Sequence, residues 1–335
     1  MIWLTWRQFR LQALAGLGAV AVIAALFAAT RPALVALAAD IGYTGCTAGC
    51  AELADAFVKR AEDSYFATLF YGALVLLFAG PALIGLFWGA PLVARELETG
   101  THRLVWNQTV SRTRWLAVKL AAGALVTALA AGLLSLVITW WASPLDRAGG
   151  WMEPYVFAAR GMVPVAYAVF AFAAGVAIGM VLRRTTVAMA VTLVVVAAAM
   201  VASPYLLRPH LATPVTFSAP LGADDIGELM LSQDGSVVLG AQTPVAGAWV
   251  LEQSVDTAAG VPFTGPYDRT KCGMEATAGP RGCHQWVAAQ NLTQRVVYLG
   301  ADKFWTLQWR ESGVVLGAAV LFVIFCFWWI RRRVT

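Results

Sequence analysis

The feature that most constrains this chain is a set of six long apolar runs. A helix that crosses a hydrocarbon core of about 30 Å needs roughly 20 mostly apolar residues. Apart from Lys119 the runs contain no Asp, Glu, Lys or Arg, and they are Leu11–Thr30, Thr68–Val93, Leu116–Trp141, Gly161–Leu182, Thr186–Leu207 and Ser312–Ile330. Only 13% of the 335 residues are charged, which is about half the share of a soluble protein. We therefore predict an all-α polytopic membrane protein with six transmembrane helices, the second kinked at Pro81.

The first run needs a separate decision, because a cleaved signal peptide also begins with basic residues before an apolar stretch. Arg7 and Arg10 fit such a start. However, the run is longer than the roughly 7–15 residues of a signal-peptide core, and Arg31-Pro32 is not a convincing cleavage site. We predict a retained helix.

The lysines and arginines predict an orientation, since they concentrate in short cytoplasmic segments. With the amino terminus inside, the cytoplasmic pieces are residues 1–10, 94–119, 183–185 and 331–335. These pieces hold 12 of the 24 basic residues and two of the 19 acids, which leaves 12 basic residues and 17 acids elsewhere. We expect both termini to be cytoplasmic. The basic balance then reflects topology, and no nucleic-acid partner is expected.

Two outer segments remain. Residues 31–66 are polar, with a short helix expected over Ala51–Ala61. Residues 208–311 are long enough to fold as a mixed extracellular domain between helices five and six, with short strands near Ser236–Gly240 and Gly247–Leu251. The expected organisation is then residues 11–207 for helices one to five, 208–311 for this domain, and 312–335 for helix six and a basic tail.

Cysteine usage agrees with that placement. Four cysteines fall in the outer segments and none in the cytoplasmic loops, which fits an oxidising exterior. Local pairing of Cys46 with Cys50 and of Cys272 with Cys283 is the simplest of three connectivities. Because no histidine or second close cysteine accompanies the first pair, no metal site is predicted. Cys326 lies alone in the last run, as a small apolar residue.

The loop between runs two and three, residues 94–115, has the features most informative about function. Gly100 is expected to end one short helix in the left-handed conformation, with Thr101 and Ser111 as caps of the following helices. The loop mixes both charge signs with Leu97 and Trp106, which suits docking against another protein. A solvated turn, with its arginines reaching lipid headgroups, explains the composition equally well.

Its residues resemble a family pattern. Arg95-Glu96-Leu97-Glu98-Thr99-Gly100-Thr101 followed by Val110-Ser111-Arg112 is similar to the R-E-x-E-x-G-T and V-S-R pattern of ABC transporter permeases of the type-2 exporter class. Thr109 stands where that pattern usually has proline. The stretches Trp3–Gln8, Gly85–Glu96 and Phe304–Trp309 resemble the actinobacterial branch of these permeases.

The resemblance implies a mechanism and partners. Residues 1–10 would form an amphipathic connecting helix anchored at the membrane face by Trp3, Trp6 and Phe9. The loop would dock on an ABC ATP-binding subunit, through Arg95, Glu96, Leu97, Glu98, Gly100, Thr101, Arg103, Trp106 and Arg112. Two such subunits, holding ATP and Mg, would drive this chain and a second permease copy in a bacterial cell membrane. Cargo would pass along the permease interface, lined by spans two and five.

Other function classes find little support. The chain has no G-x-x-x-x-G-K-[ST] motif, so it is expected to hold no cofactor and to be non-catalytic by itself. Nearly uncharged runs disfavour a proton- or sodium-coupled carrier. His102, His210 and His284 lie on separate segments, and no hydrolase or zinc-protease motif is present, so no catalytic residue is predicted.

The sequence therefore predicts the permease subunit of an ATP-driven exporter that moves an amphipathic or hydrophobic compound outward, with multidrug or antibiotic resistance as one expected role. The alternative is a membrane-anchored sensor or immunity protein that binds an antibiotic or peptide through its outer domain. A membrane enzyme such as a lipid-group transferase would need a polar constellation that the sequence does not show. A G-x-x-x-G pattern at Gly175–Gly179 indicates close helix packing, either within the chain or between copies.

Overall fold

The computed structural model describes residues 2–47, 49–101, 111–232, 236–241, 247–272 and 279–333. It confirms six helical stretches that are long and apolar enough to cross a membrane. They are Arg10–Asp40, Tyr65–Glu98, Arg112–Gly149, Val163–Leu182, Thr185–His210 and Ala301–Arg332. Five of these stretches are longer than the corresponding apolar runs, because flanking residues continue the helices. The stretch Val163–Leu182 is two residues shorter than its run.

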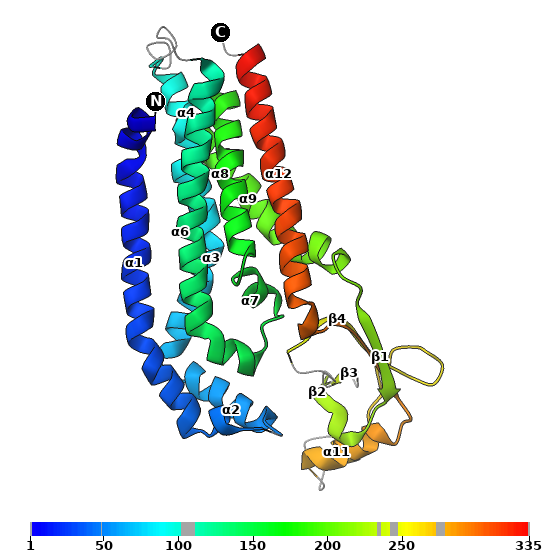
Figure 1. Cartoon of the computed structure of the whole chain (residues 1–335). Helices are drawn as coiled ribbons and strands as arrows, with labels where there is room; N and C mark the ends of the chain where they lie inside the picture. Colours follow the sequence, from blue (N-terminus) through cyan, green and yellow to red (C-terminus); the bar gives the residue numbers. More distant parts are fainter. Residues whose placement is uncertain are drawn as a thin grey trace. The chain divides into compact units, whose positions relative to one another are not determined.

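The chain divides into two compact units. The membrane unit contains Met1–Gly149, Pro154–Leu211 and Trp305–Thr335, and the strand unit contains Gly150–Glu153 and Ala212–Phe304. Within the membrane unit the spans run alongside one another, and the two ends of the chain lie at the same end of the bundle (Figure 1).

The membrane unit is built from helices joined by short turns. Its first half contains α1 (Ile2–Asp40), α2 (Ala51–Glu62), α3 (Tyr65–Ile84), the π-helical turn η2 (Gly85–Gly89), α4 (Ala90–Glu98) and α6 (Arg112–Gly149). Its second half contains α7 (Pro154–Ala158), α8 (Val163–Leu182), α9 (Thr185–Ala202), the π-helical turn η3 (Ser203–Leu207), the 3-10 turn η4 (Arg208–His210) and α12 (Phe304–Arg332).

Helix α1 differs from the sequence expectation. The expected connecting helix over residues 1–10 is not separate, because one helix of 39 residues runs from Ile2 to Asp40 and passes through Pro32. Proline removes a single backbone donor, and the turns beyond it are held by Leu34 and Ala38, which are fully buried in the same cluster as Phe57. The side chains of Trp3, Trp6 and Phe9 lie outside the described set.

The second span contains a π-helical turn at Gly85–Gly89, shortly after Pro81. Glycines let α8 approach this turn closely. A Cβ at Gly89 would lie 2.6 Å from the Phe172 carbonyl oxygen, and one at Gly175 would lie 2.6 Å from the Gly85 carbonyl oxygen. The G-x-x-x-G pattern therefore packs inside the chain, and α8 is the most buried span, with 72% of its apolar window enclosed.

The strand unit has its own sheet and core. Strands β1 (Val215–Pro220), β5 (Thr293–Leu299) and β4 (Trp249–Asp256) form an antiparallel sheet in that order, and β2 (Ile226–Leu231) pairs with β3 (Val237–Ala241). Short helices α10 (Arg269–Cys272) and α11 (Gly279–Ala288) pack on the same core. The strands expected near residues 236–240 and 247–251 correspond to β3 and the start of β4.

Both local cysteine pairs are disulfide-bonded. Cys46 joins Cys50 just before α2 in the membrane unit, and Cys272 joins Cys283 between α10 and α11 in the strand unit. Cys326 is a buried free thiol in α12.

Candidate functional site

The candidate site is the elbow between α4 and α6, at the end of the membrane unit that holds both chain ends. Helix α4 stops at Glu98, and Gly100 follows with a φ of +72°, the left-handed conformation that favours glycine. The Ser111 hydroxyl accepts a hydrogen bond from the Arg114 amide at 3.3 Å and caps α6. Both features match the sequence expectation. Arg103 and Trp106 lie outside the described residues.

Glu96 joins α4 to α6. The Lys119 ammonium group donates to Glu96 Oε1 at 2.5 Å and to the Leu92 carbonyl at 3.3 Å. Its side chain is only 3% exposed, and its Nζ lies 4.8 Å from the centre of the Trp115 ring. A buried ammonium group is tolerated only when paired, so the one charged residue of the third apolar run is fixed to the acidic motif of the elbow.

Glu98 joins α4 to α9. Its Oε2 accepts from the Thr185 amide at 2.9 Å and from the Thr185 hydroxyl at 2.6 Å. Thr185 is the first residue of α9, and the preceding Arg184 makes no side-chain cap. A carboxylate at a helix N-terminus satisfies a free amide and complements the helix dipole. The cap of α9 is therefore supplied by α4, 87 residues earlier in the chain.

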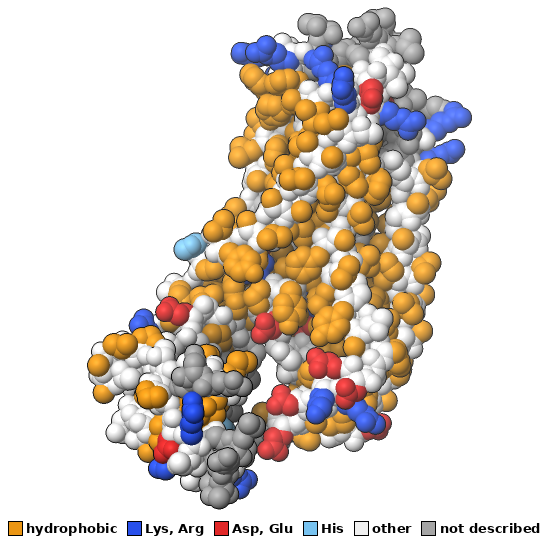
Figure 2. Space-filling view, turned by 180° about the vertical axis from the view of Figure 1, so that it is seen from behind, with side chains coloured by type: hydrophobic (Ala, Val, Ile, Leu, Met, Phe, Trp, Pro, Cys, Tyr) orange, Lys and Arg blue, Asp and Glu red, His pale blue; other side chains and the backbone are white. Residues whose placement is uncertain are grey.

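The turn between α8 and α9 connects this region to the end of α12. Arg183 adopts a left-handed conformation with φ of +54°, and its guanidinium donates to the Arg333 carbonyl, at the end of α12, at 2.9 Å. Figure 2 shows Lys and Arg side chains gathered at this end of the membrane unit. The elbow is thus linked by polar contacts to α6 and α9, and the α9 turn to α12.

The described residues of the predicted docking set divide into two groups. The exposed ones are Arg95, Glu98, Thr101 and Arg112, and the half-buried ones are Glu96, Leu97 and Gly100. Leu97 packs against the apolar cluster around Trp115 and Met180. The carboxylates of Glu96 and Glu98 both bond to other helices of the chain, although Glu98 is also exposed, and sequence spacing alone did not indicate these contacts.

A buried polar network lies at the opposite end of the spans. Glu311 on α12 accepts from Arg208 Nε at 2.9 Å, from Ser203 Oγ at 2.7 Å and from Tyr167 Oη at 3.3 Å. The Arg208 guanidinium also donates to the Pro154 carbonyl at 2.8 Å. The side chains of Arg208 and Glu311 are 1% and 0% exposed.

Two further polar contacts reinforce that end. Arg160 pairs with Asp146 through two hydrogen bonds of 2.7 and 3.0 Å. Gln308 Oε1 accepts from the amides of Met162 and Val163 at 2.9 and 3.1 Å. The apolar runs themselves contain no charged residue besides Lys119, but the expected absence of buried ionisable residues from the spans is wrong. The helices extend past the runs and bury Asp146 and Glu311 as partners of Arg160 and Arg208.

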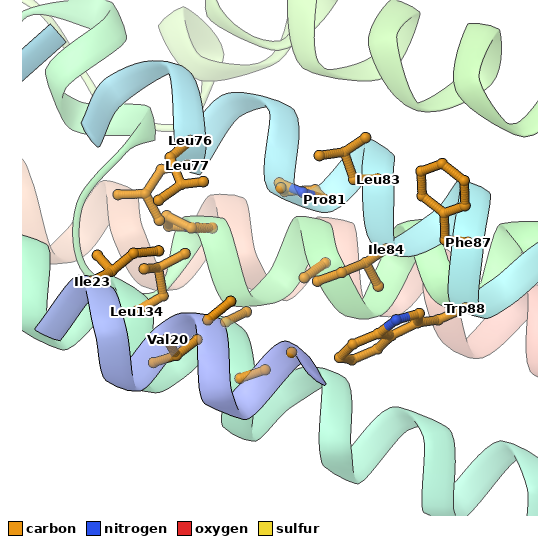
Figure 3. Close-up of a pocket in the computed structure, with 17 residues that line it drawn as sticks. Val20, Ile23, Leu76, Leu77, Pro81, Leu83, Ile84, Phe87, Trp88 and Leu134 are labelled. Carbon is orange, nitrogen blue, oxygen red and sulfur yellow. The ribbon is translucent and has the colours of Figure 1, made fainter. Parts of the chain in front are cut away.

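A groove with an entirely apolar lining opens among α1, α3, η2, α6 and α8 (Figure 3). Its volume is about 230 Å³. A second apolar groove of about 200 Å³ lies among α8, α9, η3 and α12, with Tyr167 and Ser203 at its wall. Neither groove is lined by a charged residue.

Comparison with known protein families identifies a match. The family model described as "ABC-2 membrane transporter related" matches residues 17–208, from α1 to the start of η4, and includes the elbow. No curated protein and no solved structure matches the chain.

Proposed function

We propose a function from one premise: the chain belongs to the ABC-2 membrane transporter related family, whose model covers more than half of its length. The family identifies a multi-pass membrane protein and a permease subunit of an ABC transporter, which implies a separate ATP-binding subunit. We take this chain to be the membrane subunit of an exporter, driven by ATP that is bound with Mg on that partner. The observation that carries the proposal is the family match across the elbow.

In the proposed complex two permease copies and two ATP-binding subunits act together in a bacterial plasma membrane. Both chain ends face the cytoplasm, which is supported by the arginines around the elbow and at the end of α12 (Figure 2). An amphipathic or hydrophobic cargo is supported by the groove among α8, α9, η3 and α12, which no charged residue lines. Cargo moves outward.

The contacts of the elbow suggest how it would transmit force. The exposed Arg95, Thr101 and Arg112 would contact the ATP-binding subunit. Glu96 and Glu98 would carry the resulting displacement to α6 and α9, because charge-assisted hydrogen bonds are the stronger ones between helices. The two acids then act as positioning residues within the chain.

The first test is co-purification of the detergent-solubilised protein from its native membrane, followed by mass spectrometry. Recovery of an ATP-binding cassette subunit in about equal amount supports the proposal. Recovery of the protein alone would refute it, and would favour a membrane-anchored binding protein that acts through the strand unit.

A second test addresses Glu98 and needs no identified cargo. Hydrogen exchange of the first turn of α9 is measured in the co-purified complex, with and without ATP and vanadate. We expect Glu98→Ala to speed exchange at Thr185–Ala188 and to remove its response to ATP, while the partner stays bound. Glu62→Ala, an exposed acid at the end of α2, is the matched control. An unchanged ATP response in Glu98→Ala would remove this residue from the coupling path.

A further inference from the structure

Helix α1 packs very differently along its length. From Phe27 onward it is held by buried Phe27, Leu34 and Ala38, and the Thr30 hydroxyl accepts from the Trp141 indole at 3.1 Å. Between residues 11 and 26 only Ala13 is buried. The half of α1 nearer the elbow end therefore has few apolar partners within the chain.

The larger groove lies under this loosely packed half. Gly16, Val20 and Ile23 of α1 form one wall, and α3 with η2 forms the facing wall, from Leu76 to Trp88 (Figure 3). The Trp88 ring lies so close to α1 that a Cβ at Gly16 would come within 2.6 Å of it. Contact between Trp88 and α1 thus bounds the groove near η2.

The groove opens at the surface of the membrane unit. Leu83 and Phe87, which line it, are 45% and 51% exposed. All lining residues are Gly, Ala, Val, Ile, Leu, Pro, Phe or Trp. Such a lining offers water no side-chain hydrogen-bond partner, and dry apolar cavities in proteins bind small hydrocarbons. The groove of about 230 Å³ therefore favours hydrocarbon over water.

We propose that this groove binds one acyl chain of a bilayer phospholipid. The chain enters sideways from the membrane and fills the space between α1 and α3. Phospholipid is the occupant that this position favours, since the groove opens within the membrane spans, where acyl chains surround the protein. The bound chain supplies apolar contacts that residues 11–26 lack from the protein itself. The proposal does not depend on the ATP-binding partner.

The test is photo-crosslinking in phosphatidylcholine nanodiscs that contain a phosphatidylcholine with a diazirine on its acyl chain. We expect adducts on the peptides that contain Gly16–Ile23 and Leu83–Trp88. Ala131→Leu projects a larger side chain into the groove from α6, and we expect it to lower adduct yield at these peptides about tenfold, which corresponds to about 1.4 kcal/mol. Ala121→Leu, at an exposed position of the same helix away from the groove, is the matched control and should label as the natural protein does.

A second filling variant guards against misfolding. Gly80 lines the groove and a Cβ built there meets nothing within 4 Å, so Gly80→Leu adds apolar volume at a second, independent position. It should reproduce the loss seen with Ala131→Leu at an unchanged gel-filtration profile. Equal labelling in all variants would overturn the proposal. So would the absence of adducts at both peptides in the natural protein, which is the result expected if a second protein copy or a non-lipid amphiphile covers the groove.

Discussion

Removing the carboxylate of Glu311 should destabilise the membrane unit strongly. Its two oxygens accept four hydrogen bonds, two of them from Arg208, and both side chains are essentially inaccessible to solvent. Glu311→Leu would leave the guanidinium buried without its counter-charge. Breaking a buried ion pair in this way costs about 3–5 kcal/mol of unfolding free energy. By the relation for soluble domains of about 150–250 residues, the thermal midpoint should fall by about 6–20 °C.

The double variant separates the charge from the packing. Arg208→Met combined with Glu311→Leu removes both charges and fills the space with apolar side chains of similar volume. Such replacements of a buried ion pair are often neutral or stabilising. We therefore expect the double variant to recover most of the loss. The assay is tryptophan emission during heating in one detergent, with gel filtration before each scan.

A surface ion pair provides the control. Lys303 and Asp302 lie 2.8 Å apart, with side chains 42% and 68% exposed, and exposed pairs contribute little. Asp302→Leu should leave the midpoint nearly unchanged. The reasoning is refuted if Glu311→Leu costs less than about 1 kcal/mol, or if the double variant is as unstable as the single one.

Two further predictions concern packing and covalent links. Gly89→Ala should lower the free energy of unfolding by about 1–3 kcal/mol, because the added methyl group would clash with the Phe172 backbone. Gly72→Ala is the control in the same thermal assay. A Cβ there meets nothing within 4 Å, so this variant should not be destabilised. Cys272→Ser should lower the stability of the strand unit by about 2–4 kcal/mol, and mass spectrometry without reductant should find Cys272 and Cys283 without free thiols in the natural protein; free thiols at both positions would contradict this.

The spans were predictable because length and missing charge are local properties of the sequence. The left-handed Gly100 and the cap at Ser111 were predictable for the same reason, since each depends on a few neighbouring residues. The continuation of α1 to Asp40 was not, because proline usually marks a helix end. What holds the helix beyond Pro32 is burial of Leu34 and Ala38 against distant residues.

Partners distant in sequence account for what the sequence could not show at the site. Glu98 and Thr185 are separated by 87 residues, and Arg208 and Glu311 by 103. In the sequence Glu98, Arg208 and Glu311 lie near the ends of apolar runs, where they cannot be distinguished from solvated loop residues. Only the folded chain shows that each is matched by a specific partner, and that the second pair is buried.

These contacts give α9 an unusual attachment. Only 17% of its apolar window is buried, and apolar side chains gain little by leaving lipid for another helix. Polar contacts hold both ends of its span: Glu98 of α4 caps the start, and Arg208, beyond the end of α9, pairs with Glu311 of α12. Because little of the span is enclosed and its ends are joined to other helices, a displacement of α4 in the proposed complex would tilt this span. On the proposed function, the elbow would act on α9 through Glu98, and Arg208 would carry the tilt to α12. Loss of Glu98 should then disturb the ATP response while sparing the fold, whereas loss of Glu311 should cost the fold itself.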